Sequence, residues 1–291
     1  MSRWRTVRKI DAHVHVVLHQ RQESDLSFNP PEAMLRAMDD HNVERAIVVP
    51  INFPDYFPLR AAYDVDWLGA NNELQAKISR DSNGRLVSFA DCRIDGPYED
   101  GHAVSEAMGR AVDVLGLDGL KIHAYNLDVE ATDRRLEPWI DAAARFAVPI
   151  VFHANPSGGA TAFHGCSPSK IYEAMHGRSH PFVIAHMGGV AFLETLAGGG
   201  YVDVSGTLLW LAELYGAAFC TRLVRRIGVD RILFATDFPI YPYEAYDRVL
   251  EAMDLTDDEV ERIAFANAER MLRGRPPVDR EAESPETGPI G

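Results

Sequence analysis

The chain has 291 residues, of which 46% are hydrophobic and 25% are charged. These shares match folded globular proteins and exclude a disordered, collagen-like or coiled-coil chain, while the length admits either two ordinary domains or one large barrel. The formal net charge of −14 repels nucleic-acid phosphates and anionic lipids, so we expect a small-molecule substrate and neither a nucleic-acid nor a membrane partner, with formation of a homo-oligomer left open.

Eight short apolar runs, rich in Val, Ile and Phe, recur along the chain with amphipathic segments between them. In chain order they are VRKIDAHVHVV from Val7, ERAIVVPIN from Glu44, RLVSFADCRI from Arg85, LDGLKIHAY from Leu117, VPIVFHAN from Val148, PFVIAHMG from Pro181, YVDVSG from Tyr201 and RILFATDFP from Arg231. Intervening segments such as PPEAMLRAMDDHN and RRLEPWIDAAARFA have the apolar spacing of helices. This alternation predicts parallel β/α units, and eight strands imply a closed barrel.

The domain boundaries follow from the same pattern. A barrel of this kind uses about 250 residues, so residues 1–273 fit one barrel, and no linker-like change of composition divides them. The last eighteen residues, GRPPVDREAESPETGPIG, contain prolines and acids but no large apolar cluster. We therefore predict an α/β fold, a single (β/α)8 TIM barrel, followed by a disordered, acidic, Pro-rich tail over residues 274–291.

Asp11, His13 and His15 stand at alternate positions of the first run, and strand periodicity places such residues on one face. Two histidines with this spacing are hard to bury unless they share a cation or a proton. Neutral imidazole nitrogens suit Zn²⁺, Mn²⁺ or Fe²⁺. The pattern predicts a metal site, with Asp11 either a ligand or a structural partner.

Three more runs end in a polar residue at the point where an apolar strand should continue. His153 closes VPIVFHAN, His186 closes PFVIAHMGG, and Asp237 closes RILFATDFP. Asp237 taken alone is also a reasonable turn residue before Pro239. Because the carboxyl ends of barrel strands meet on one face, three such residues in register predict one shared site.

Together these motifs resemble the amidohydrolase superfamily, in its amidohydrolase-related branch. The resemblance runs from DAHVH through GLKIH, FHAN and AHMGG to ATDFP and the closing FANAERML. It implies that His13, His15, His153 and Asp237 bind one divalent metal, Zn²⁺ first and Mn²⁺ or Fe²⁺ as alternatives, and that His186 lies beside this metal. It does not fix the reaction, because members hydrolyse amides and lactones, cleave C–C bonds, hydrate or decarboxylate.

Lys121 and His123 share a strand face in GLKIH and are predicted to bind substrate, together with Arg60 and Arg93 at the rim of the pocket. Two other interpretations of Lys121 stay open. In several branches of the superfamily a lysine of the fourth strand is carboxylated and bridges two metals, and an inward ammonium can also simply pair with a neighbouring carboxylate.

The cysteines and the N-terminal segment indicate the cellular compartment of the protein. Cys92, Cys166 and Cys220 are widely spaced and form neither a disulfide framework nor a CxxC metal site. Cys166 follows His164 in a Gly-rich loop, but no third orienting group indicates a nucleophile. No apolar stretch follows MSRWRTVRK, and no run of about 18 apolar residues occurs. We expect free thiols and a cytoplasmic protein.

The predicted function is hydrolysis of a small, anionic, carboxylate-bearing ester, lactone or amide by a metal-activated water, with Asp237 and His186 as the catalytic residues. One alternative is a metal-dependent nonoxidative decarboxylase of a small or aromatic acid. The stretch after His186 offers Glu194 and no arginine, which counts against that alternative. Another alternative is a non-catalytic, metal-stabilised binding barrel, and the retention of every expected ligand counts against it.

Overall fold

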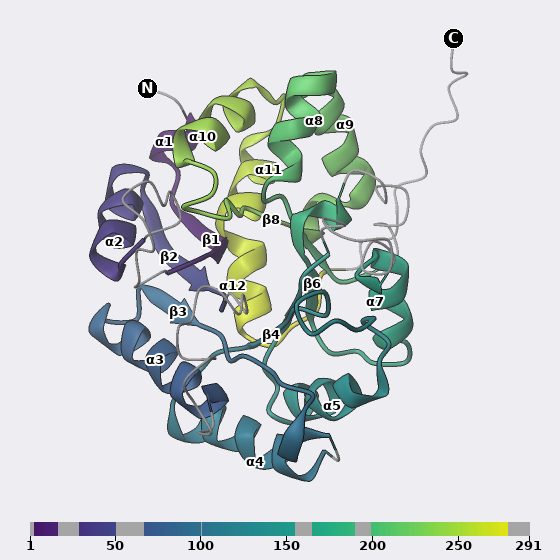
Figure 1. Cartoon of the computed structure of the whole chain (residues 1–291). Helices are drawn as coiled ribbons and strands as arrows, with labels where there is room; N and C mark the ends of the chain where they lie inside the picture. The colour runs from purple at the N-terminus through teal and green to yellow at the C-terminus, as the bar shows by residue number, and fades with distance from the viewer. Residues whose placement is uncertain are drawn as a thin grey trace.

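The structure is a computed structural model that describes residues 3–16, 29–50, 67–99, 101–154, 165–189 and 199–278. Eight short strands form its centre (Figure 1). They are β1 (Lys9–Val14), β2 (Val43–Val48), β3 (Leu86–Ser88), β4 (Leu120–Ile122), β5 (Ile150–Phe152), β6 (Phe182–Ile184), β7 (Tyr201–Asp203) and β8 (Ile232–Leu233). Each of the eight predicted runs contains one of these strands.

The strands close into a barrel. All neighbouring pairs are parallel, in the orders β1-β2-β3 and β4-β5-β6-β7-β8. A bridge between Ala90 and Leu120 joins the first set to the second, and a bridge between Val14 and Phe238 returns from the end of the chain to β1. The predicted single (β/α)8 barrel is confirmed.

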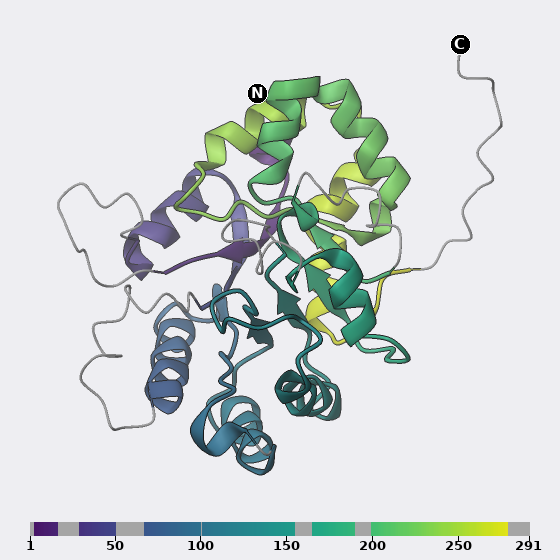
Figure 2. The ribbon, with the colours of Figure 1, turned by 45° about the vertical axis from the view of Figure 1, so that its right-hand side comes forward.

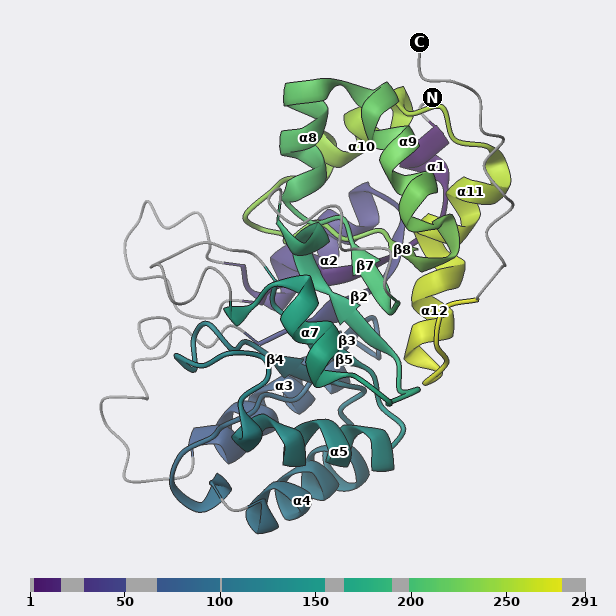
Figure 3. The same ribbon diagram turned by 90° about the vertical axis from the view of Figure 1, so that its right-hand side faces the viewer.

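Helices surround this barrel. Those of the described residues are α1 (Arg3–Thr6), α2 (Pro31–Asp40), α3 (Trp67–Asp81), α4 (His102–Gly109), α5 (Glu137–Arg145), α7 (Pro168–Ala174), α8 (Thr207–Tyr215), α9 (Ala217–Ile227), α10 (Tyr243–Ala252), α11 (Asp257–Glu261) and α12 (Asn267–Leu272). Short 3-10 helices are η2 (Gly96–Tyr98), η4 (Arg134–Leu136), η5 (Ala185–Gly188) and η7 (Val229–Arg231), and π-helical segments are η3 (Arg110–Val114) and η8 (Arg262–Ala266). Figure 2 shows α3, α4 and α5 side by side, and Figure 3 shows α8, α9 and α10 on the opposite side of the strands.

Apolar side chains form two clusters, one between the strands and the surrounding helices and one inside the barrel. The larger cluster contains residues of both strands and helices, among them Ile184 of β6 and Trp139 of α5. The smaller one consists of alternate strand residues, such as Val151 and Leu233, together with Phe265 from the C-terminal helices. These residues fill the barrel interior, as layered side chains do in this fold. The next inward positions along the strands are polar, and they form the candidate site.

Some predicted features lie outside the described residues: Arg60 with the segment 51–66, His164, Glu194 and the tail from residue 279. Among the described helices, none is long and apolar enough to cross a membrane. Cys92, Cys166 and Cys220 are buried free thiols, as predicted.

Candidate metal centre

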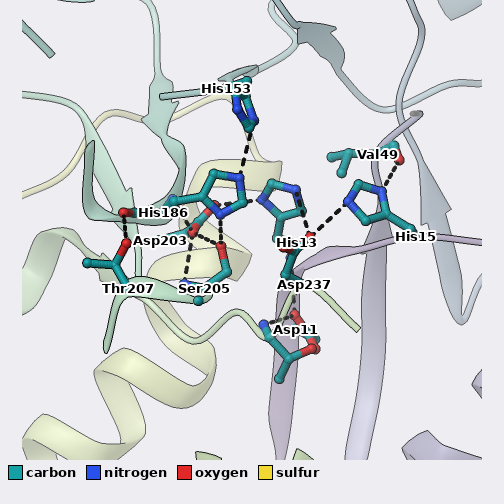
Figure 4. Close-up of polar contacts among 12 residues, drawn as sticks. Asp11, His13, His15, Val49, His153, His186, Asp203, Ser205, Thr207 and Asp237 are labelled. Carbon is teal, nitrogen blue, oxygen red and sulfur yellow. Dashed lines mark hydrogen bonds and ion pairs between the residues drawn. The ribbon is translucent and has the colours of Figure 1, made fainter. Parts of the chain in front are cut away.

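The first and last strands bring His13, His15 and Asp237 together. The amide N–H of Asp237 donates to the carbonyl oxygen of His13 at 2.8 Å, and the N–H of His15 donates to the carbonyl oxygen of Phe238 at 2.8 Å. These bonds continue the seam between β1 and β8 beyond the strands. As a result, one ligand atom from each of the three side chains lies within 4.8 Å of the other two (Figure 4).

Asp11 does not join this group. The pairing of β1 with β2 shifts register between Asp11 and Val14, so the strict alternation expected for Asp11, His13 and His15 does not hold. The carboxylate of Asp11 instead accepts the amide N–H groups of His13 and Thr236, both at 3.1 Å, and the hydroxyl of Thr236. Of the two roles predicted for Asp11, ligand or structural partner, the structure supports the second. Its carboxylate connects β1 to the segment that carries Asp237.

Hydrogen bonds fix which ring nitrogens can bind a cation. His13 Nδ1 lies 2.8 Å from Asp203 Oδ2, and His15 Nδ1 lies 2.9 Å from the carbonyl oxygen of Val49. A carboxylate or a carbonyl oxygen only accepts, so both Nδ1 atoms carry the proton and both neutral rings present a bare Nε2.

These bare nitrogens face another acceptor. His15 Nε2 is 2.9 Å and His13 Nε2 is 3.8 Å from Asp237 Oδ1, a buried oxygen with no hydrogen-bond partner among the described residues. Lone pairs at such distances repel unless a cation lies between them. The donor set of two imidazoles and a carboxylate therefore fits a divalent metal such as Zn²⁺ or Mn²⁺.

His153, the fourth predicted ligand, lies beside His186 and outside this three-residue group. Its Nδ1 is 3.2 Å from Nε2 of His186, and its ring stacks on the ring of His123 with centroids 3.8 Å apart. Both residues directly follow neighbouring strands, His123 after β4 and His153 after β5. Ligation by His153 stays a prediction, and so does substrate binding by His123.

His186 follows β6 in a left-handed backbone conformation, with φ 56° and ψ 31°. Its Nδ1 lies 2.8 Å from Ser205 Oγ, its amide N–H donates to Asp203 Oδ1 at 2.8 Å, and its carbonyl accepts the hydroxyl of Thr207. Asp237 is also left-handed, with φ 62°. Such backbone at non-glycine residues is uncommon and concentrates at functional sites.

Asp203 and Ser205 are site residues that sequence reasoning did not single out. Both are fully buried, and Asp203 accepts hydrogen bonds from His13, from the His186 backbone and from Ser205. The signal was present in YVDVSG, where an acid and a serine two residues apart occupy inward positions of an otherwise apolar strand.

The pKa values fit neutral histidines beside ionised carboxylates. Burial, assisted by the charge of Lys121, lowers the pKa of His13 to about 3, and burial also lowers the pKa of His186. Burial by itself would raise the pKa of Asp203, and the hydrogen bond from His13 Nδ1 holds it below its usual range.

Lys121 lies at the same end of the barrel and is 1% exposed. Its Nζ has no hydrogen-bond partner among the described residues. Burial lowers its pKa to about 8, against the opposing charges of Asp203, Asp237 and Asp91. A buried ammonium without a partner is costly, which makes Lys121 a candidate anchor for a substrate anion.

The remaining predicted site residues are less central. The guanidinium of Arg93 donates two hydrogen bonds to the carboxylate of Asp95, at 2.6 and 2.8 Å, so its charge is already compensated locally. Substrate binding by Arg93 stays a prediction. Burial raises the pKa of Cys166 to about 11, which agrees with the expectation that this thiol is no nucleophile.

The barrel and its cluster define a class of protein: (β/α)8 barrels with candidate metal ligands at the carboxyl ends of the strands. The sequence model of the family named Amidohydrolase matches residues 10–274. Because this match spans most of the chain, the protein belongs to the amidohydrolase family. No functionally curated protein matches the chain.

Solved structures share the fold. The 2,6-dihydroxybenzoate decarboxylase from Rhizobium matches with a TM-score of 0.69 and 18% identity, over 91% of this chain and 98% of the other. A 5-carboxyvanillate decarboxylase from Novosphingobium aromaticivorans, complexed with manganese and 4-hydroxy-3-methoxy-5-nitrobenzoic acid, matches at 0.64 and 15%, over 92% and 97%. An uncharacterized TIM-barrel protein from Bordetella bronchiseptica matches at 0.68 and 18%, over 92% and 100%. At these identities the likeness concerns the fold.

Proposed function

We propose that the chain is a metal-dependent hydrolase of a small ester, lactone or amide that carries a carboxylate. The observation that carries this proposal is the convergence of three acceptor atoms, His13 Nε2, His15 Nε2 and Asp237 Oδ1, with no proton available between them. A divalent cation bound there would lower the pKa of a coordinated water towards about 7 and provide hydroxide at neutral pH.

The side chains around this position have distinct tasks. Asp237 would hold the ion and accept a proton from the attacking water. His186, with Nδ1 directed to Ser205 and an unprotonated Nε2 that lies 3.2 Å from His153 Nδ1, would be a second proton acceptor. Lys121 pairs with the substrate carboxylate, because its buried ammonium lacks another partner among the described residues. A neutral histidine that accepts a proton suits water attack better than protonation of a carbon.

Nonoxidative decarboxylation is the second candidate. The same metal position and the same Lys121 could hold the carboxylate that leaves, and two structures that share the fold are decarboxylases of aromatic acids, one of them complexed with manganese. This reaction requires a proton donor at the carbon that loses CO₂, whereas the hydrogen bonds of His186 favour the unprotonated Nε2.

One experiment separates the two reactions. The manganese- or zinc-loaded enzyme is screened against carboxylated lactones, esters and amides and against hydroxylated aromatic acids, and the first turnover found is repeated in ¹⁸O-water. Hydrolysis places one ¹⁸O atom in the product. Release of CO₂ with an unlabelled organic product would establish decarboxylation instead.

His186 offers a second test on the same substrate. His186→Asn should retain metal near the wild-type level while kcat falls by roughly 10² or more, the scale of a lost general base. As a control we expect His41→Asn to keep wild-type kcat, because His41 Nδ1 binds Asp247 of α10, at 2.8 Å, and none of the described residues of the candidate site. Loss of the ion from His186→Asn would identify His186 as a ligand.

A further inference from the structure

We infer that Asp203 and Ser205 are positioning residues that fix the protonation pattern of two site histidines, His13 and His186. The purpose of this arrangement rests on the proposed metal-dependent function, in which an unprotonated Nε2 of His13 binds the metal and an unprotonated Nε2 of His186 accepts a proton. The hydrogen bonds themselves are independent of substrate and reaction, so they can be tested separately.

The two oxygens of Asp203 have different partners (Figure 4). Oδ2 accepts from His13 Nδ1 at 2.8 Å. Oδ1 accepts the amide N–H of His186 at 2.8 Å, the amide N–H of Ser205 at 3.1 Å and the hydroxyl of Ser205. An ionised carboxylate is an acceptor only, so every one of these partners donates. His13 therefore carries its proton on Nδ1.

Ser205 transmits the same constraint to His186. A hydroxyl has one proton, and Ser205 donates it to Asp203. Ser205 Oγ must then accept from His186 Nδ1, which lies 2.8 Å away. If Ser205 donated to His186 instead, its oxygen would face the carboxylate with no proton between them. His186 is thus also an Nδ1–H tautomer, and its unprotonated Nε2 accepts from His153 Nδ1, which lies 3.2 Å away.

Asp203 also fixes the backbone position from which the His186 side chain projects. His186 and Met187 both have left-handed backbone, with φ of 56° and 50°. The bond from the His186 amide to Asp203, and that from the Thr207 hydroxyl to the His186 carbonyl, hold this turn in place. One carboxylate on β7 thereby sets both the position and the tautomer of His186, as well as the tautomer of His13.

This division predicts selective effects. Ser205→Ala removes the acceptor for His186 alone. In Asp203→Asn, three donors converge on one side of the side chain and favour the amide oxygen there. The amide NH₂ then faces His13 Nδ1, which forces the proton of His13 onto Nε2. A ring protonated on Nε2 cannot bind a metal through that atom, so metal affinity should fall.

The test measures the ring ¹⁵N chemical shifts of the full chain, zinc-loaded and metal-free, which distinguish Nδ1–H from Nε2–H tautomers directly. His13→Gln and His186→Gln assign the signals. In the wild-type protein both rings should be Nδ1–H. Ser205→Ala should move the proton of His186 towards Nε2 and leave His13 unchanged, and Ser205→Thr, which keeps the hydroxyl, should restore the His186 pattern.

Zinc affinity, measured by competition with a chelator, is the second measurement. Asp203→Asn should weaken it by about 10–100-fold, the usual effect of removing the partner of a ligating histidine, while Ser205→Ala should leave it within about twofold of wild type. Two matched controls should change neither measurement: Asp247→Asn, a buried acid bound to His41 Nδ1 at 2.8 Å, and Thr221→Val, a buried hydroxyl in α9.

The inference is overturned if either histidine of the wild-type protein is an Nε2–H tautomer, or if Ser205→Ala leaves the His186 signals unchanged. Should Asp203→Asn fail to fold, Ser205→Ala still decides the question for His186. Absence of any hydrolytic turnover, with the tautomers as stated, would contradict the proposed function and leave this inference standing.

Discussion

The side chain of Lys121 is buried beside the candidate metal centre with no hydrogen-bond partner for Nζ among the described residues. An uncompensated buried charge destabilises the empty site, and a substrate carboxylate would relieve this cost. Lys121 should therefore favour substrates that carry a carboxylate, because binding such a group removes the cost of its buried charge. The alternative of a carboxylated lysine that bridges two metals remains a prediction that metal stoichiometry can decide.

Lys121→Met should raise KM for a carboxylate-bearing substrate by about 10–100-fold, because a hydrogen bond to a charged group contributes about 1.5–3 kcal/mol. The methyl ester of the same substrate is the control, since its KM should change little. Steady-state kinetics on both substrates provide the measurement. An equal rise in KM for the two would mean that Lys121 supports the pocket without contacting the carboxylate.

Lys9 is a second buried amine, at the opposite end of β1. Its Nζ donates to the carbonyl oxygens of Val7 and His41, and burial lowers its pKa to about 8 despite the charges of Asp247 and Asp11. A lysine in the unfolded chain titrates near 10.4. Between these pH values the unfolded state binds more protons than the folded state, so the contribution of Lys9 to stability rises with pH.

The unfolding free energy of the wild-type protein relative to Lys9→Met should therefore increase from pH 7.5 to pH 9.5, by about 1–2 kcal/mol. Chemical denaturation of both proteins at the two pH values measures this difference, and other titrating groups cancel in the comparison. A difference that stays constant or decreases with pH contradicts a lowered pKa for Lys9.

At the scale of elements, the join between β3 and β4 depends on close packing. The strands lack a regular ladder there, and the bridge from Ala90 to Leu120 follows directly after Gly119. A Cβ atom on Gly119 would overlap the ring of Phe89, which is fully buried in the barrel interior. Glycine at this position lets the two halves of the barrel approach each other.

Gly119→Ala should lower the unfolding free energy by about 1–3 kcal/mol, the usual cost of overpacking a core. Gly109→Ala is the matched control, because Gly109 lies in the helix α4 and the added Cβ would approach only the edge of the Phe146 ring, with the nearest atom, Cζ, at 3.3 Å. This control should be neutral or slightly stabilising, since alanine favours helix. Urea denaturation measures both variants, and similar values for the two would contradict a tight join at Gly119.

For the whole molecule, the candidate metal centre lies on the seam that closes the barrel. His13 lies in the first strand, His15 directly follows it, and Asp237 follows the last strand. A cation between them joins the two ends of the sheet, so metal binding should stabilise the entire fold. This differs from a site contained within one loop, where binding would order only that loop.

Added Zn²⁺ or Mn²⁺ at 100 times its Kd should stabilise the folded chain by about 2.7 kcal/mol. This corresponds to an increase in Tm of roughly 4–5 °C for a protein of this size. Thermal unfolding with metal and with chelator measures the shift, and the double variant His13→Ala with His15→Ala should show none. A metal-dependent shift that persists in the double variant would place the ion elsewhere.

The sequence alone determined the barrel and most of its site. Periodicity of apolar residues is a local property, so all eight strands and the amphipathic helices could be read from it. Parallel strands of a closed barrel present their carboxyl ends on one face, and this rule predicts that His13, His15, His186 and Asp237 lie close together. The motifs DAHVH and ATDFP together also pointed to the family that matches residues 10–274.

Only the tertiary structure decided which of these side chains meet and in which protonation state. The register shift in β1 turns Asp11 away from the histidines, although regular alternation predicts one shared face. Asp203 lies 190 residues from His13 in the chain, yet their side chains are 2.8 Å apart, and nothing local in YVDVSG encodes this partner. The hydrogen bonds of the histidine Nδ1 atoms are made to residues on or just after other strands, so the sequence alone does not show which ring nitrogens are unprotonated and able to bind a cation.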